Sequence, residues 1–173
     1  ADRATRDLIQ ACSFQSTFAP KTAVLNAETQ SKFYLANVGL FYGRHLAQRQ
    51  MYEEALDVFG KIELIEVVDP ATYLFYRAVC EHSLLMKTQG LQTLEMLLKQ
   101  TDNVPVRYST IATLMQVDLQ ALKEKSLDEV ARKMSGVERL LKLGRGGQGV
   151  QKVEDEIIAS LDEIIKKLEQ QQS

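Results

Sequence analysis

The fold of this chain is decided by residues 70–97, whose sequence is PATYLFYRAVCEHSLLMKTQGLQTLEML. Part of this stretch recurs 35 positions later, because Pro70 returns as Pro105 and Tyr73 as Tyr108. The preceding segment matches it at the same offset, with Gly43 aligned to Ala78, Ala55 to Gly90, Phe59 to Leu94 and Ile62 to Leu97. A fixed period of this length is typical of stacked helical hairpins, none of which can bury its apolar face alone.

The composition fits one domain, or one domain with an appendage. A chain of 173 residues buries roughly 70% of its unfolded surface, which is enough for a core without disulfides. The formal charge of -2 argues against a nucleic-acid footprint, so we expect no nucleic-acid partner. No apolar run reaches the roughly 18 residues that a transmembrane helix needs. Ala1 in place of methionine fits an exported protein with a cleaved signal peptide and a chain trimmed at its start equally well, so the compartment stays open.

Apolar residues recur with a 3.6-residue period along most of the chain, whereas alternating β-branched runs do not appear. The sequence therefore predicts an all-α fold, an irregular stack of antiparallel hairpins with about seven or eight helices. Asp69 can cap a helix that begins with Pro70, where the missing N–H costs nothing. The helices expected before residue 126 cover a short stretch around Leu8, Ile9 and Cys12, then residues 22 or 27 to 50, 52–66, 70 to 83–86, 87–100 and about 102 to 125.

Residues 126–129, SLDE, form a capping box at the start of a further helix. Its apolar stripe consists of Leu127, Val130, Met134, Val137 and Leu141. After a loop at 144–149, a last helix carries a second stripe, formed by Val150, Val153, Ile157, Leu161, Ile164 and Leu168. On its outer face Asp162 precedes Lys166, and Glu163 precedes Lys167, by four residues. The two stripes predict an antiparallel hairpin over residues 126–170.

The repeated residues resemble the tetratricopeptide repeat, which pairs two helices per ~34 residues with small residues where they cross. Gly43, Tyr52, Ala55 and Phe59 stand at the small and aromatic positions of that repeat, and Ala78, Gly90 and Leu94 follow more weakly. The chain has no tryptophan, and its third unit loses the phase, so the array is degenerate. The resemblance implies a repeat region over residues 1–125, with units near 37–69 and 70–104 and a partial unit from 105.

In that family the first helix of each unit lines a concave groove that binds peptides. The resemblance places this groove on Asn37, Leu40, Arg44, Gln48, Thr72, Phe75, Val79 and His82. Leu40 and Arg44 occupy positions where the carboxylate-clamp members need Lys and Asn, so binding of chaperone tails is not implied. Among the aromatic residues, Phe75 is the best candidate for anchoring a peptide.

The glycine-rich loop allows two sharper interpretations that its surroundings disfavour. Gly144-x-Gly146-x-x-Gly149 matches the dinucleotide fingerprint, but that fingerprint needs a preceding strand, and here an amphipathic helix precedes it. Gly146-Gly147-Gln148 matches the tripeptide of peptide-release factors, but the helix that follows is acidic rather than basic. A flexible hairpin turn, with Gly144 ending the first helix, explains the loop more simply.

Catalytic and metal-binding constellations are not evident in the sequence. Cys80 and His82 are two positions apart on a helix and point to nearly opposite faces, and Cys12 and His45 add no ligand pair with metal-site spacing. We therefore expect no cofactor, no metal and no enzymatic activity. The leading hypothesis is a non-catalytic scaffold that binds a protein or peptide of unknown identity. The alternatives are a structural or oligomerising module that uses residues 126–170, and a helical enzyme or ligand-binding domain whose site is not visible in sequence.

Overall fold

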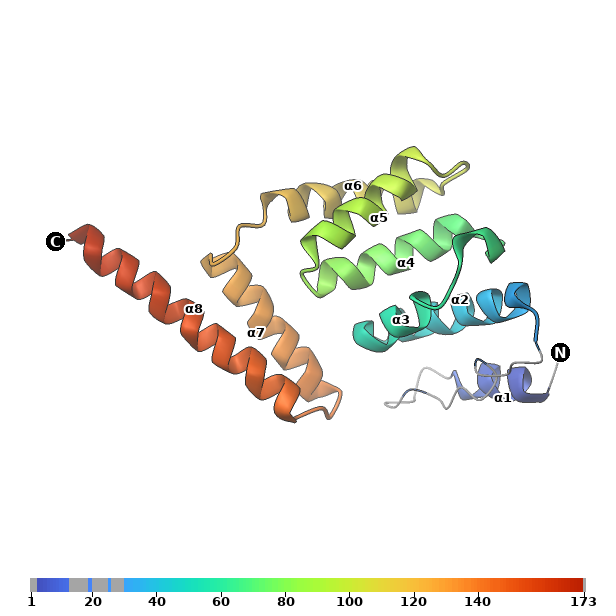
Figure 1. Ribbon diagram of the computed structural model, residues 1–173, viewed down its shortest axis with the longest axis horizontal. Helices are drawn as coiled ribbons and strands as arrows, with labels where there is room; N and C mark the ends of the chain where they lie inside the picture. The colour runs from blue at the N-terminus through green and yellow to red at the C-terminus, as the bar shows by residue number, and fades with distance from the viewer. Residues whose placement is uncertain (1–2, 13–18, 20–24, 26–29, 173) are drawn as a thin grey trace. The chain divides into compact units, whose positions relative to one another are not determined.

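The computed structural model describes residues 3–12, 19, 25 and 30–172, and every regular element in this part of the chain is helical (Figure 1). The elements are α1 (Arg3–Ala11), α2 (Lys32–Gln48), α3 (Tyr52–Phe59), the 3₁₀ turn η2 (Leu64–Glu66), α4 (Pro70–Ser83), α5 (Lys87–Lys99), α6 (Val106–Ala121), α7 (Leu127–Lys142) and α8 (Gln148–Gln172). The all-α prediction is thus confirmed for the described residues. Among them, no helix combines the length and the apolar character needed to cross a membrane.

The chain divides into two compact units, residues 1–120 and 121–173. In the first unit, α2 packs against α3, and α4 packs against α5. Helix α4 also contacts α3 and α2, so the two hairpins lie against each other. The second unit consists of α7 packed against α8.

Side-chain caps fix where several helices begin. Ser31 accepts a hydrogen bond from the backbone N–H of Tyr34 at the start of α2. Asp69 caps α4 by accepting from the N–H of Thr72 at 2.9 Å, and Pro70 occupies the first turn, as the sequence predicts. The prediction of one helix from residue 22 or 27 to 50 is wrong at its start, because Ser31 is extended and α2 begins only at Lys32. Residues 22 and 27 themselves lie outside the described residues.

Several other predicted boundaries are wrong as well. The helix expected to run to Glu66 ends at Phe59, and residues 64–66 form the separate turn η2. The Asn37 side chain holds this turn, because it donates to the carbonyl of Glu66 at 2.9 Å and accepts from the N–H of Val68 at 3.0 Å. These bonds link segments about thirty residues apart, so local sequence patterns could not reveal them.

Further differences concern α6 and the second unit. Helix α6 runs from Val106 to Ala121 rather than from about residue 102 to Lys125. Asn103 and Lys125 have φ values of 54° and 56°, which are incompatible with a continuous helix through them. Helix α8 begins at Gln148, so part of the predicted 144–149 loop is helical. Gly144 has a φ of 72° directly after the C-cap Leu143, which confirms its role in ending α7. In α1, Leu8 is buried as expected, whereas Ile9 is 50% exposed.

Small residues allow close helix contacts in the first unit. A Cβ atom added at Gly43 would meet the Phe59 ring, and one added at Gly90 would lie 2.7 Å from the Cδ1 atom of Leu119. Ala55 and Ala78 are fully buried. The residues of the 35-position echo therefore lie where α2 meets α3 and where α5 meets α6, and a large side chain from the neighbouring helix fills the space that each glycine leaves.

We expect Gly43→Ala to lower the free energy of unfolding of the first unit by about 1–2 kcal/mol. The new Cβ would press on a fully buried ring whose Cδ1 and Cζ atoms lie 2.9 Å away. The strain exceeds the helix propensity that alanine gains over glycine. Urea denaturation followed by circular dichroism measures the change.

The matched control is Gly136→Ala in α7, where an added Cβ has no atom within 4 Å. This substitution should stabilise the second unit by up to about 1 kcal/mol through helix propensity alone. If both substitutions shifted stability in the same direction, the packing explanation for Gly43 would be wrong.

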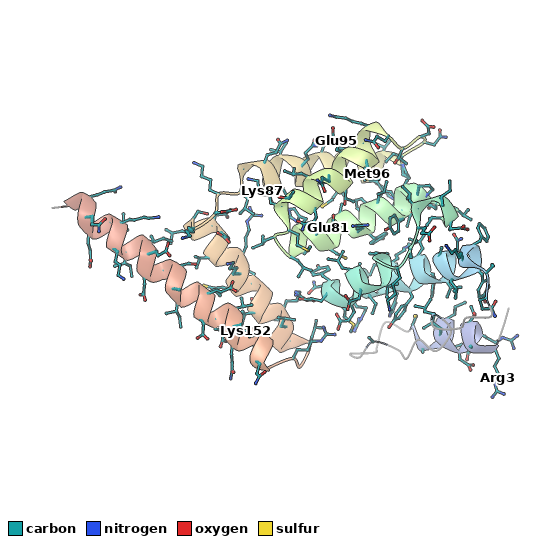
Figure 2. The ribbon with its side chains drawn as sticks, viewed as in Figure 1. Arg3, Glu81, Lys87, Glu95, Met96 and Lys152 are labelled. Carbon is teal, nitrogen blue, oxygen red and sulfur yellow. The ribbon has the colours of Figure 1, made fainter. Side chains whose placement is uncertain are left out.

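A buried carboxylate of α4 pairs with a partly exposed arginine of the same helix. Glu81 is 1% exposed, and its Oε1 atom accepts from Arg77 Nε at 2.9 Å. Arg77 also donates to the hydroxyl of Tyr73, which donates to the carbonyl of Phe59 at 3.1 Å. Figure 2 labels Glu81 on α4 and Lys87 at the start of α5. This chain of bonds joins α4 to the end of α3.

Arg77→Met should destabilise the first unit by roughly 2–4 kcal/mol, because it leaves the Glu81 carboxylate buried without its counter-charge. The estimate lies below the cost for a pair buried at both ends, since the Arg77 side chain is 38% exposed. The double variant R77M/E81M should recover most of the loss in the same denaturation experiment. A double variant as unstable as Arg77→Met would contradict this account.

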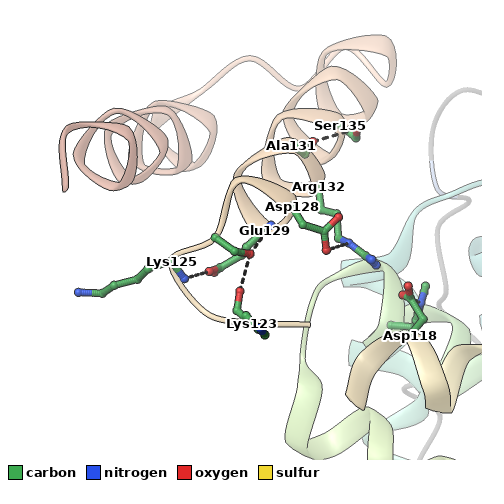
Figure 3. A network of polar contacts seen from close by, with 10 residues as sticks. Asp118, Lys123, Lys125, Asp128, Glu129, Ala131, Arg132 and Ser135 are labelled. Atoms are coloured by element: carbon green, nitrogen blue, oxygen red, sulfur yellow. Dashed lines mark hydrogen bonds and ion pairs between the residues drawn. The ribbon is translucent and has the colours of Figure 1, made fainter. Parts of the chain in front are cut away.

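The second unit is an antiparallel hairpin whose apolar surface is only partly covered. Its start is capped as predicted, because Ser126 accepts from the N–H of Glu129, while the Glu129 carboxylate accepts from the N–H of Lys125 (Figure 3). Val130, Val137, Val150 and Ile157 form its buried cluster. The rest of the predicted α7 stripe is exposed, at 62% for Leu127, 56% for Met134 and 54% for Leu141.

Candidate functional site

Helices α4 and α6 lie side by side and run in the same direction. Thr72 and Tyr108 hydrogen-bond through their hydroxyls at 3.3 Å, and His82 and Asp118 approach to 2.8 Å between Nε2 and Oδ2. Both bonds join residues 36 positions apart. A constant separation along both helices requires a parallel arrangement in one register.

Aromatic rings fill the space between these two helices. The Phe75 and Tyr108 rings are stacked, with centroids 4.1 Å apart and an interplanar angle of 12°. Tyr76 meets the edges or faces of both rings at 5.3 and 6.3 Å. Phe75 is 7% and Tyr108 4% exposed, so Tyr76, which is half-buried, is the ring of this cluster that solvent reaches most.

Two exposed guanidinium groups border the aromatic cluster. Arg44 of α2 lies over the Tyr76 ring at 5.5 Å, and Arg107 of α6 lies over the Tyr108 ring at 4.9 Å. Gln48 of α2 donates to the Tyr76 hydroxyl at 3.1 Å. Neither arginine pairs with a carboxylate in the part of the chain that the structure describes. We name the surface formed by Arg44, Gln48, Tyr76, Arg107 and Tyr108 the arginine–aromatic surface.

Charge is distributed unevenly among the helices of the first unit. Helices α2, α4 and α6 together carry four Lys or Arg and two Asp or Glu residues. Helices α3 and α5 together carry two Lys or Arg and four Asp or Glu residues. The two acidic side chains of the first group, Glu81 and Asp118, already face Arg77 and His82. The arginine–aromatic surface is therefore cationic on a protein of net charge -2.

The structure brings some of the predicted groove residues together and uses others as framework. Arg44 and Gln48 meet at Tyr76, while Thr72, Phe75 and His82 contact α6. Asn37 fastens the η2 turn, and Leu40 is buried in the core, so neither offers a free polar or apolar contact. Val79 is half-buried. Phe75, the predicted anchor, is only 7% exposed and so offers little surface to a peptide.

Sequence reasoning missed Tyr76 and Arg107 as contributors to this surface, and it missed the contacts that Tyr108 and Asp118 make with α4. Tyr108 was visible as a repeat of Tyr73, but its ring stacks on Phe75 instead of occupying the place equivalent to Tyr73. One signal was present in the sequence, because α4 and α6 residues 36 apart form chemically matched pairs such as His82 and Asp118. This matching of residues 36 positions apart can be recognised only once the register of α4 and α6 is known.

Hollows also lie away from the arginine–aromatic surface. One pocket of about 200 Å³ lies between α2 and the end of α3, with the exposed Lys32–Glu63 ion pair at its rim. No group of three or more His, Cys, Asp or Glu residues suitable for a metal occurs among the residues that the structure describes. Cys80 is buried, and burial raises the pKa of the Cys12 thiol, which disfavours the thiolate form of Cys12.

Comparisons of the chain with protein-family models, with curated proteins and with solved structures gave no match. The function of the protein is therefore inferred from the geometry of the arginine–aromatic surface.

His45, next to Arg44 but 9% exposed, should make stability depend on pH. Burial and then the Arg49 charge lower its pKa below the ordinary 6.5, so the unfolded chain binds a proton more readily than the folded one. This contribution to stability is complete above pH 6.5 and is lost as the pH falls below it. His45→Gln should therefore lose less stability than the parent between about pH 7.5 and about pH 5. Equal losses in urea denaturation would remove His45 as the cause.

Proposed function

We propose that this protein is a non-catalytic binding module whose first unit is a degenerate tetratricopeptide-like stack. Support comes from the parallel α4 and α6 helices, from the α2–α3 and α4–α5 hairpins, and from the small residues where these helices meet. In such a stack α2, α4 and α6 are the first helices of successive units. Their shared face then serves as the ligand surface.

The ligand that fits this surface best is an acidic segment of another protein. The observation that carries this choice is the pair of exposed arginines held over tyrosine rings without a carboxylate partner in the described chain. Stacking on a ring orients a guanidinium while leaving N–H donors free for a carboxylate. The half-buried Tyr76 offers apolar contact between them. A surface of this kind combines an anchoring ring with orienting charges, as peptide sites commonly do.

Selection of random displayed peptides on the immobilised full chain tests the proposal. We expect the selected peptides to be enriched in Asp and Glu and to bind the double variant R44Q/R107Q at least about tenfold more weakly, since each charge-assisted hydrogen bond contributes about 1.5–3 kcal/mol. R44K/R107K should retain part of the affinity. Fluorescence anisotropy with labelled selected peptides gives the dissociation constants.

The matched control is K61Q/K99Q, which removes two exposed cations elsewhere on the first unit. It should leave peptide affinity within about twofold of the parent. Selection of no acidic peptide, or equal weakening by both double variants, would overturn the proposal.

A further inference from the structure

Helix α8 extends well beyond its partner in the hairpin. It has 25 residues against 16 in α7. Lys125, just before α7, pairs with Glu163 at 2.9 Å, and Lys133 pairs with Glu156 at 3.2 Å. These pairs fix an antiparallel register in which the start of α7 lies beside residue 163. The residues of α8 after Ile164 therefore extend beyond the start of α7.

Two adjoining apolar stripes run along α8 and share Leu161. Val150 and Ile157 belong to the buried cluster formed with α7, and Val153, Leu161 and Ile164 pack against that cluster. The second stripe consists of Ile158, Leu161, Ile165 and Leu168, at alternating spacings of three and four residues. Within it Ile158 is 58%, Ile165 52% and Leu168 53% exposed. The α7 hairpin thus leaves a coiled-coil-like seam largely uncovered.

Residues 161–168, LDEIIKKL, have complementary halves. Between two leucines, this segment carries an acidic pair, then a pair of isoleucines and then a basic pair. An acidic residue four positions before a basic one also stabilises an isolated helix. In the described chain, however, neither Asp162 nor Lys166 lies within ion-pair distance of another residue. When two copies of this segment meet in opposite directions, each acidic half lies along a basic half. In parallel, like charges would meet.

We propose that a second copy of this chain docks antiparallel on α8 through the segment 161–168. The two-fold axis passes close to Ile164, and the interface is isologous. It brings Leu161 beside the partner's Ile165, and Asp162 within reach of the partner's Lys166. Glu163 stays with Lys125 on the outer side of its own helix. The exposed end of α8 in one chain covers the open stripe of the other.

Sedimentation equilibrium of the full chain over a concentration series tests the dimer. Asp162→Lys and Lys166→Glu should each raise the dimer dissociation constant at least about tenfold, because each creates two like-charge contacts across the axis. The swapped variant D162K/K166E should dimerise again as a homodimer. An equimolar mixture of the two single variants should also form a dimer. Ile165→Asp should abolish association, and circular dichroism should show that each variant keeps its helicity.

Lys152→Glu is the matched control, since it makes the same charge change at an exposed position of the same helix outside the segment. It should leave the dissociation constant within about twofold of the parent. A chain that stays monomeric throughout the series overturns the proposal. So does a swapped variant that fails to restore the dimer, or an equal effect of Lys152→Glu and Lys166→Glu. These results are independent of peptide binding at the arginine–aromatic surface.

Discussion

The stack of Tyr108 on Phe75 is the contact on which the candidate site depends. It is nearly buried, and the Thr72 hydroxyl holds the Tyr108 hydroxyl in place. Through this contact α6 lies parallel to α4, and Arg107 comes to the same side as Arg44. Without this stack, the helices that carry the two arginines would not be held near each other. This buried stack therefore sets the spacing of the two exposed arginines.

The stack of Tyr108 on Phe75 requires the helices of the first unit to pack closely. Gly43 admits the Phe59 ring, and Gly90 admits Leu119. Such close approaches at helix crossings favour small residues, since an added methyl would displace a fully buried neighbour. The buried Arg77–Glu81 pair adds a different constraint, because charges in a core must remain matched. Together these contacts favour one arrangement of hairpins over alternatives with similar hydrophobic burial.

The two units differ in how completely they bury their apolar side chains. In the first unit, the echo residues Ala55, Phe59, Ala78, Leu94 and Leu97 are completely buried. We assign binding there to charges and to one half-buried ring. In the second, the hairpin buries one stripe of α8 and exposes another. A third helix is what normally covers such a stripe in a helical bundle. The charge order along α8 indicates that a copy of the same helix can provide it.

The amino-acid sequence by itself determined the helical class, the caps at Asp69 and Ser126, the end of α7 at Gly144 and the small residues of the helix contacts. These features depend on periodicity, turn chemistry and side-chain size, all of which are local. Tertiary structure alone decided that α3 stops at Phe59, that the Phe75 ring is buried against Tyr76 and Tyr108, and that α7 buries only part of its stripe. Each of these outcomes depends on contacts between segments far apart in the chain, and a local pattern carries no information about which distant residue will fill a given space.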